Sequence, residues 1–306
     1  MLELHALQVF LVAAETENFS ETGRILQMSQ PAVSGHIQAL ENRLNTRLFD
    51  RTGRNIKLNE LGEAFVPVVR KLLREARLAE EFIAAQHGQL VGEISVGCST
   101  ATGKYLLPRV MARFLDVYPA VRLSCLVGPR GEALDRLIAG DIDLAVSSLR
   151  VPHREIEYRH VADDQLVLIA PPDHPWAQAG VIRPQDLLDH EIILRESTSG
   201  TAGTLNRELA ALDLSLEVLK SRFVLGSTEA IVQAVMEGAA PGFASYLIAA
   251  PALRQEAVVQ IEVEGLVMIQ RLYMARHTNF RPTEAQKAFW EFVFAPENSY
   301  LRQIVT

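Results

Sequence analysis

Serine and threonine side chains gather in two loops that stand in equivalent positions of the sequence. The stretches "ISVGCSTATGKYLLP" and "IILRESTSGTAGTLN" each pass from an apolar strand through a hydroxyl-rich loop into a helix. A helix N-terminus presents unpaired backbone N–H groups and partial positive charge, which together attract anions. Any one of these hydroxyls could simply cap its helix, but the repetition favours a ligand held between the two loops. The residues expected to bind it are Ser99, Thr100, Thr102, Ser199 and Thr201, with Ser147 or Ser148, at the end of another strand, on a third side.

The first loop also admits two other kinds of chemistry. The run from Gly97 to Ala101 nearly matches the G-x-S-x-G elbow that carries the nucleophile of serine hydrolases, but its final glycine is missing. A hydrolase using Ser99 would need a downstream acid and histidine, and His277 is the one histidine in a suitable late position. Cys98 would allow a redox-sensing regulator, although the scarcity of nearby basic residues favours a buried structural thiol. Both alternatives stay open, and we expect no catalytic residue, metal or cofactor.

Short apolar strands alternate with helices from Gly92 onward, a pattern typical of parallel α/β units. The expected strands are "EISVGCS", "RLSCLVG", "IDLAVSS", "QLVLIAP", "EIILRES", "SRFVLGS", "VVQIEV" and "IQRLYMA". The expected helices span residues 109–114, 132–139, 204–211, 229–237, 247–253 and 283–294. With one hydroxyl-rich loop on each side of a cleft, these elements predict a hinged, two-lobed domain that binds a small molecule.

A second group of polar side chains lies in the stretch "MSQPAVSGHIQALE", residues 28–41. Gln30, Ser34 and Gln38 recur at helical spacing, almost opposite an apolar stripe that includes Val33 and Ile37. The stretch therefore predicts a helix with one buried face and one exposed face of short polar groups. Glutamine is a good reader of adenine, and serine bonds to either bases or phosphates, so the exposed face suits DNA.

The start of this helix is well specified, because Ser29 can serve as N-cap and Pro31 suits the first turn. Two helices are expected before it, one over residues 4–16 and one that begins after the cap candidate Ser20 and runs through Leu26. Two short helices joined by a tight turn form a helix-turn-helix, whose second helix lies in the DNA major groove.

A basic hairpin is expected directly after these helices. In "RTGRNIKL" the turn pair Thr52-Gly53 stands between Arg51 and Arg54, which predicts a short wing with two arginines beside the phosphate backbone. Between residues 43 and 57, five basic residues stand against one acid, Asp50, which gives a local charge of +4. The whole chain carries −7, so the attraction to DNA must come from this local patch.

The stretch "NFSETGRILQMSQPAVSGHIQALENRLNTRLFDRTGRNIKLNELG" resembles the DNA-binding domain of the LysR-type transcriptional regulators. The matching elements are Phe19-Ser20, Leu26, Ser29 to Ser34, Ile37, Leu40-Glu41, Leu44, Leu48-Phe49, Arg51 and Gly62, and the departures are Gly23 and Gly35. The resemblance implies an N-terminal all-α winged helix-turn-helix, a long linker helix and a C-terminal α/β two-lobed effector domain similar to periplasmic binding proteins. It also implies that the partners are double-stranded DNA and a small-molecule effector, for which we favour an anion. The residues expected to meet DNA are Ser29, Gln30, Pro31, Ser34, Gln38, Arg51 and Arg54.

A long helix is expected over residues 60–86, where Pro67 is a turn residue and Asn59 a candidate N-cap. Apolar residues recur every three or four positions, close to a coiled-coil seam. They are Leu61, Phe65, Val68, Leu72, Ala76, Ala79 and Ile83. A helix this long cannot bury such a stripe against a small domain alone, so we expect it to dimerise. The family resemblance implies a homodimer, usually doubled to a homotetramer.

The expected division of the chain is a DNA-binding domain at residues 1–58, a linker helix at 59–87 and an effector-binding domain at 88–306. Lobe I is expected at about 91–162 and 268–306, and lobe II at about 163–267, with crossovers near Ala162-Asp163 and Val267-Met268. Two cysteines are too few for a disulfide framework, which favours a reducing compartment. No apolar run approaches the roughly 20 residues of a membrane span, so we expect a cytoplasmic protein without membrane contact.

Overall fold

A computed structural model of the chain describes residues 1–52, 55–87 and 89–302. These residues form two compact units, of which the first comprises Met1–Gly92 together with the short segment Ala139–Asp141. The second unit contains the rest of the described chain. Each unit has its own hydrophobic core.

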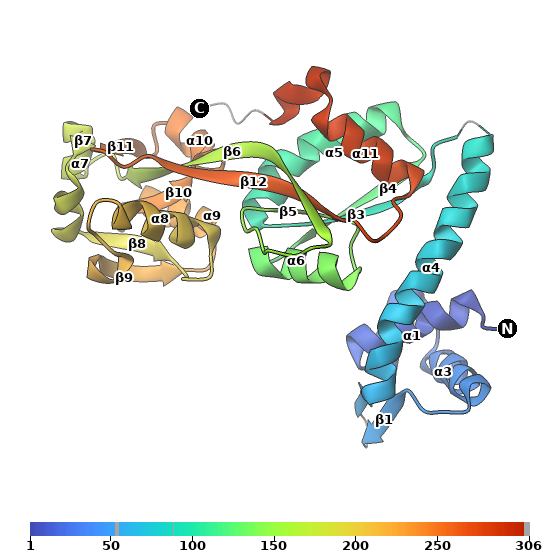
Figure 1. Ribbon diagram of the computed structural model, residues 1–306. Coiled ribbons are helices and arrows are strands. Elements are labelled where there is room, and N and C mark those ends of the chain that lie inside the picture. The colour runs from blue at the N-terminus through green and yellow to red at the C-terminus, as the bar shows by residue number, and fades with distance from the viewer. Residues whose placement is uncertain (53–54, 88, 303–306) are drawn as a thin grey trace. The chain divides into compact units, whose positions relative to one another are not determined.

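The first unit is a three-helix domain with a β-hairpin, followed by a long helix (Figure 1). Its elements are α1 (Leu4–Thr16), α2 (Phe19–Leu26), α3 (Gln30–Leu44), β1 (Phe49–Thr52), β2 (Asn55–Leu58) and α4 (Glu60–Gln86). The two strands pair antiparallel, with Phe49 opposite Leu58. The arrangement confirms the expected winged helix-turn-helix and linker helix.

Side-chain caps set the starts of these helices. The Ser29 hydroxyl accepts a hydrogen bond from the Ala32 N–H at 3.3 Å, and the Asn59 side chain accepts one from the Gly62 N–H at 2.8 Å, as expected. The prediction of Ser20 as the cap of α2 was wrong, because Asn18 takes that position and accepts from the Ser20 N–H at 2.9 Å. The helix begins at Phe19, whose side chain is buried in the core. The cap therefore lies at Asn18, two residues before the expected Ser20.

The core of the first unit also absorbs part of the long helix. Phe10 is fully buried, and its ring lies 5.7 Å from that of Phe49 and 5.4 Å from that of Phe65. Phe65 therefore packs inward and does not belong to a free apolar seam. The large apolar side chains of α4 that do remain exposed are Leu61, Val68, Leu72, Phe82 and Ile83.

A buried carboxylate joins the hairpin to α3. The Glu41 side chain is almost completely buried, and its Oε1 accepts hydrogen bonds from the backbone N–H groups of Leu48 at 2.8 Å and Phe49 at 3.3 Å. Hydrogen bonds to a charged acceptor are about twice as strong as neutral ones. Glu41 thus fixes the position of the first strand of the wing relative to α3.

The second unit is built on a ten-stranded mixed sheet. Its strands are β3 (Gly92–Cys98), β4 (Val121–Val127), β5 (Leu144–Ser147), β6 (Ile156–Ala170), β7 (Val181–Ile182), β8 (Glu191–Arg195), β9 (Lys220–Leu225), β10 (Gly242–Ser245), β11 (Val259–Val263) and β12 (Met268–His277). Its longer helices are α5 (Leu107–Val117), α6 (Arg130–Ala139), α8 (Gly200–Ala210), α9 (Thr228–Met236), α10 (Tyr246–Arg254) and α11 (Glu284–Phe294). Its shorter helical segments are η1 (Thr102–Leu106), α7 (Pro175–Ala179), η2 (Pro184–Leu188), η3 (Leu216–Val218) and η4 (Pro296–Arg302).

The sheet contains two groups of parallel strands joined by two long antiparallel strands. The strand order is β4-β3-β5-β12-β6-β10-β8-β9. β3 and β5 run parallel in lobe I, which we define by β3, β4, β5, α5, α6 and α11. β8 runs parallel to β9 and β10 in lobe II, defined by β8, β9, β10, α8, α9 and α10. The expected parallel α/β units are therefore present, one group in each lobe.

β6 and β12 lie side by side and pass from one lobe to the other (Figure 1). Their pairing runs from Ile156 opposite His277 to Leu166 opposite Met268. The crossovers are therefore continuous strands, whereas only their apolar parts were expected as strands from the sequence. Residues 156–164 include many polar side chains, as is usual in a strand that is partly exposed. Their apolar pattern was therefore too weak to predict a strand from the sequence. The lobe boundaries at 162/163 and 267/268 remain predictions.

Within the described part of the chain, no helix is both long and apolar enough to cross a membrane. The same described residues contain no group of three or more histidine, cysteine, aspartate or glutamate side chains arranged to hold a metal ion.

Candidate functional site

The turn between α2 and α3 is unusually close to α2. Gln27 adopts a left-handed conformation with φ of 54°, and the Met28 N–H donates to the Gly23 carbonyl at 2.8 Å. A Cβ added at Gly23 would lie 2.5 Å from the Met28 carbonyl oxygen, so the backbone occupies the space that an alanine would need. The departure from the family pattern at Gly23 therefore has a packing role. At Gly35, by contrast, an added Cβ would meet nothing within 4 Å.

The polar face of α3 is open to solvent. Gln30, Pro31 and Gln38 are exposed and Ser34 is half-buried, while Val33 and Ile37 are completely buried. Ser29 is exposed at the N-terminus of α3, where its hydroxyl caps the helix. Arg51 lies in β1, and Arg54 falls outside the described residues. The contact of these seven residues with DNA remains a prediction.

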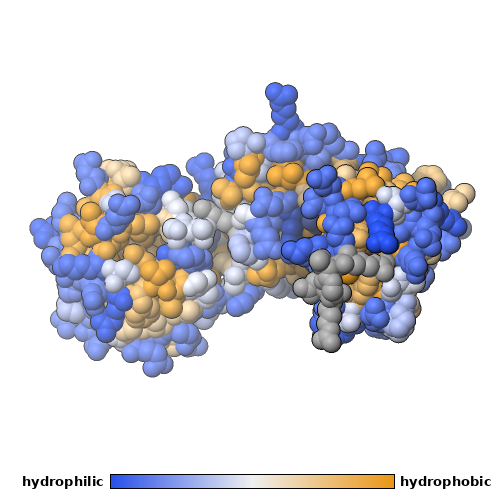
Figure 2. Space-filling view, turned by 90° about the horizontal axis from the view of Figure 1, so that it is seen from below, coloured by the Kyte–Doolittle hydropathy of each residue, from blue (hydrophilic) through white to orange (hydrophobic). Residues whose placement is uncertain are grey.

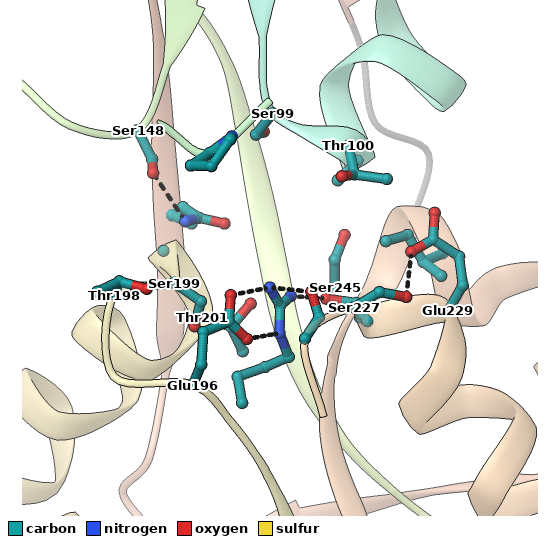
Figure 3. A pocket seen from close by; sticks show the side chains of 18 of the residues that line it. Ser99, Thr100, Ser148, Glu196, Thr198, Ser199, Thr201, Ser227, Glu229 and Ser245 are labelled. Atoms are coloured by element: carbon teal, nitrogen blue, oxygen red, sulfur yellow. Dashed lines mark hydrogen bonds and ion pairs between the residues drawn. The ribbon is translucent and has the colours of Figure 1, made fainter. Parts of the chain in front are cut away.

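A cavity of about 300 Å³ lies between the two lobes of the second unit. Five of the seven hydroxyl residues expected to bind the effector line it, namely Ser99, Thr100, Ser148, Ser199 and Thr201. Figure 3 shows those of lobe I facing those of lobe II across the open space. The two loops singled out in the sequence are therefore brought together.

Thr102 and Ser147 do not line this cavity. Thr102 is completely buried in η1, with its hydroxyl 3.2 Å from that of Ser99. Ser147 is buried and its hydroxyl accepts from the Leu149 N–H at 3.0 Å. Ser147 is the last residue of β5 and is buried in the sheet, whereas Ser148 lies beyond the end of the strand and reaches the cavity.

A third loop contributes to the cavity and was missed in the sequence. Gly226, Ser227 and Thr228 line it, and the Ser227 hydroxyl caps α9 by accepting from the Ala230 N–H at 3.1 Å. The segment "FVLGSTEA" repeats the strand, hydroxyl loop and helix of the other two loops. That signal was available, but the loop is too short to stand out beside "STATG" and "STSGTAG".

Arg195 is the one cation among the described residues that line the cavity. Its side chain is 14% exposed and makes a two-pronged ion pair with Glu196, with Nε–Oε2 at 2.8 Å and Nη2–Oε1 at 2.7 Å. Its Nη1 also donates to the Thr228 hydroxyl at 2.6 Å, and Nη2 to the Gly226 carbonyl at 3.2 Å. The ion pair with Arg195 lowers the pKa of the Glu196 carboxyl. Arg195 therefore joins the end of β8 to the loop before α9.

Lys104 and Glu229 pair across the lobes, with Nζ–Oε1 at 3.0 Å. Burial works against the charged form of Glu229, but hydrogen bonds from its own backbone N–H, Lys104 and Ser227 outweigh burial and lower the pKa. Glu229 lines the cavity, whereas Lys104 does not. Both cations near the cavity are thus already paired with carboxylates.

Two further polar groups connect the cavity to the crossover strands. The Gln270 Nε2 on β12 donates to the Ser148 hydroxyl at 2.9 Å, and a Cβ added at Gly200 would collide with the same nitrogen. The Ser245 hydroxyl, which lines the cavity, donates to Asp164 on β6 at 2.9 Å. Burial raises the pKa of Asp164 to about 7. Neither residue stood out in the sequence, because neither lies in a hydroxyl-rich loop.

The geometry does not assemble a hydrolase site at Ser99. The hydroxyl of Ser99 lies beside that of Thr102, and no histidine is among the described residues that line the cavity. His277 lies at the end of β12, buried against Phe280 at a ring separation of 4.1 Å. Cys98 is completely buried, as favoured from the sequence, with its sulfur 3.3 Å from that of Cys125.

Family models match both units of the chain. The model described as "LysR substrate binding domain" matches residues 87–295, and the model described as "Bacterial regulatory helix-turn-helix protein, lysR family" matches residues 4–63. The chain therefore belongs to the LysR family: it is a DNA-binding transcriptional regulator with an effector-binding domain.

Individual relatives agree with this assignment. The chain is 30% identical over 286 residues to the uncharacterized HTH-type transcriptional regulator MJ0300 of Methanocaldococcus jannaschii, covering 94% of this chain and 96% of that one. Among solved structures, its fold resembles full-length CbnR complexed with its target DNA, with a TM-score of 0.64, 24% identity and coverage of 95% and 99%. It also resembles the Synechocystis CcmR regulatory domain in complex with 2-PG, with a TM-score of 0.61, 24% identity and coverage of 67% and 96%.

The exposed face of α3 generates a prediction about sequence readout. Gln30→Ala and Ser34→Ala are expected to weaken binding to the cognate DNA site by about tenfold or more, since a base contact contributes about 1–3 kcal/mol of discrimination. Binding to random DNA should change little. Arg51→Ala should weaken binding to both DNAs and reduce the slope of affinity against salt by about one.

These effects are measured by titrating labelled cognate and random duplexes at several salt concentrations. Asn42→Ala, an exposed change at the other end of α3, is the control and should bind like the unaltered protein. An equal loss on both DNAs for the Gln30 and Ser34 variants would contradict base readout by this face.

Proposed function

We propose that the regulator responds to a small anionic molecule bound in the cavity between its lobes. The observation that carries the proposal is the meeting of two helix N-termini, those of α8 and α9, with Arg195 at one cavity. Each helix end offers backbone N–H groups and partial positive charge. Arg195 contacts the start of α9 through the Thr228 hydroxyl. Ser99 and Thr100 add hydroxyl donors from the opposite lobe.

The charges of the cavity suit a ligand that is released easily. The charged side chains among its described lining residues are Arg195, Glu196 and Glu229, and Arg195 is already held by Glu196. An anion would therefore depend mainly on helix ends and neutral hydroxyls, and would share Arg195 with Glu196. Such a site binds without a strong fixed positive charge, as a reversible sensor requires.

Two of the structural relatives support the proposed ligands. The CcmR regulatory domain was solved in complex with 2-PG and CbnR in complex with DNA. We extend both ideas to this chain, with the effector between the lobes and double-stranded DNA on α3 and the wing. Binding of an anion that touches both lobes would favour one angle between them, which gives the effector a way to control the protein. As a DNA-binding regulator, the protein would act in the cytoplasm.

The proposal is tested by removing one hydroxyl from each lobe. Thr100→Val and Thr201→Val are each expected to weaken anion binding by about ten- to a hundredfold, since a hydrogen bond to a charged group contributes about 1.5–3 kcal/mol. The measurement is titration calorimetry with 2-PG, inorganic phosphate and inorganic sulfate, after thermal-shift screening of these probes.

Thr204→Val is the matched control, because this buried threonine of α8 does not line the cavity. It should bind the probes as tightly as the unaltered protein. If Thr100→Val and Thr201→Val also bind with unchanged affinity, the anion site lies elsewhere.

The Arg195–Glu196 pair generates an opposite prediction. Glu196→Gln should strengthen binding of the same probes, because it removes a negative charge from the lining and releases Arg195 from its ion pair. Charges a few ångströms apart near a protein surface interact by a few kcal/mol, so a gain on the order of tenfold is expected. Glu208→Gln breaks a comparable pair with Arg207 outside the cavity and should leave affinity unchanged. Weaker binding by Glu196→Gln would mean that the ligand needs the carboxylate.

We further propose that the protein is a homodimer through α4. The exposed apolar side chains of α4 are spread along its length and include Leu61, Leu72 and Ile83. A second apolar surface supports pairing into a homotetramer: in Figure 2 apolar side chains gather on the lobe at the left of the view, which carries β9. Exposed residues of that lobe include Val218, Phe223 and Val224.

Sedimentation velocity at micromolar concentration tests the role of α4. The unaltered protein should sediment as a dimer or tetramer, and the double variant Leu72→Glu with Ile83→Glu should sediment one step lower, because it places charge in an apolar interface. Lys71→Glu, an exposed change beside Leu72, is the control and should leave assembly unchanged. A monomeric unaltered protein would overturn the proposal.

A further inference from the structure

The two cysteines of the chain lie together although they are 27 residues apart. Cys98 ends β3 and Cys125 lies in β4, and these strands are neighbours in the sheet. Their Sγ atoms are 3.3 Å apart. Cys98 is completely buried, whereas Cys125 is partly open to solvent. The sequence contains no other cysteine, so each thiol has one possible partner within the chain.

The backbone geometry permits a bond between them. Neighbouring strands lie about 4.7–4.9 Å apart, and disulfides join residues with Cα separations of about 4.4–6.8 Å. Each sulfur already points at the other, so bond formation needs the two atoms to approach by a little more than 1 Å from their 3.3 Å separation.

The pair differs from two independent thiols in its acidity. The hydrogen bond shared with Cys125, together with burial, raises the pKa of Cys98. The same hydrogen bond lowers the pKa of Cys125 to about 7. The thiolate is the reacting form of cysteine, and here it forms on the partner that solvent can reach. The other thiol remains a protonated neighbour, placed to complete the bond.

The π-helix η1 packs directly on the sulfur atoms. A Cβ added at Gly103 would lie 2.8 Å from the Cys98 sulfur and 3.6 Å from the Cys125 sulfur. Glycine thus brings the backbone of η1 against both thiols. The segment lies immediately after Thr100 and contains Lys104, which pairs with Glu229 of lobe II. A change in the position of the sulfurs therefore acts on η1, which directly follows the cavity-lining residues Ser99 to Ala101.

We propose that Cys98 and Cys125 are a modification site, at which a hydroperoxide forms a reversible disulfide that loosens η1. The Cys125 thiolate attacks the peroxide, so that an S–O bond forms and the O–O bond breaks. The hydroxide released from hydrogen peroxide, or the alkoxide released from an organic hydroperoxide, takes a proton from solvent and becomes water or an alcohol. Cys98 then attacks the Cys125 sulfur, the S–S bond forms, and the S–O bond breaks with loss of a second water that carries the Cys98 proton. Two thiols are oxidised by two electrons and the peroxide is reduced to water or to water and an alcohol. A dithiol reductant reverses the reaction by exchange.

The experiment treats the reduced full-length protein with a slight excess of hydrogen peroxide. Both free thiols are expected to disappear within one chain, with loss of two hydrogens in the intact mass, and to return with dithiothreitol. Cys98→Ser should instead stop with one added oxygen on Cys125. In Cys125→Ser the remaining thiol, that of the buried Cys98, should stay unreacted over the same time.

Hydrogen exchange on the same samples tests the effect on η1. Amides of residues 102–106 should exchange several-fold faster in the oxidised protein, while those of α8, on the other lobe, stay unchanged. Thiols that persist under peroxide, or that pair between chains, would overturn the site. A disulfide that forms without any change in exchange at 102–106 would overturn its action on η1. Neither readout needs an effector, so the result is independent of the proposed anion site.

Discussion

The antiparallel pairing of β6 with β12 is the constraint on which the effector domain depends. It joins two groups of parallel strands that would otherwise be separate α/β domains, because these two strands belong to both lobes. Ligand sites of parallel sheets form at the carboxyl ends of the strands. The paired strands bring the carboxyl ends of β3, β8 and β9 toward one space, and the hydroxyl-rich loops that follow them line it.

Local signals in the sequence were sufficient for much of this architecture. The bounds of α1 and α4, the caps Ser29 and Asn59 and the wing follow from periodicity and turn chemistry within a few residues. The repeated pattern of the two hydroxyl-rich loops, about one hundred residues apart, predicted that they face each other across one site. For the helices, their caps and the wing, the interaction that decides the structure lies close by in the chain.

Other features depend on contacts that local patterns do not contain. Thr102 and Ser147 carry suitable hydroxyls, but they are buried in the π-helix and at the end of β5. Arg195 looked like part of a strand, and its role arises from Thr228 and Gly226 in a distant loop. The polar half of β6 becomes a strand because β12 pairs with it. Tertiary contacts, rather than propensity, decide these positions.

The buried Glu41 has a consequence for the shape of DNA that the first unit can accept. One carboxylate oxygen holds the backbone of both Leu48 and Phe49, so the wing cannot swing independently of α3. These two hydrogen bonds therefore fix the spacing between α3 and the start of the wing. In the proposed mode of DNA binding, duplexes whose groove already matches that spacing would be bound without deformation, while stiffer or wider ones would have to bend to fit. Groove width would then contribute to which duplexes the domain selects, in addition to base contacts from α3.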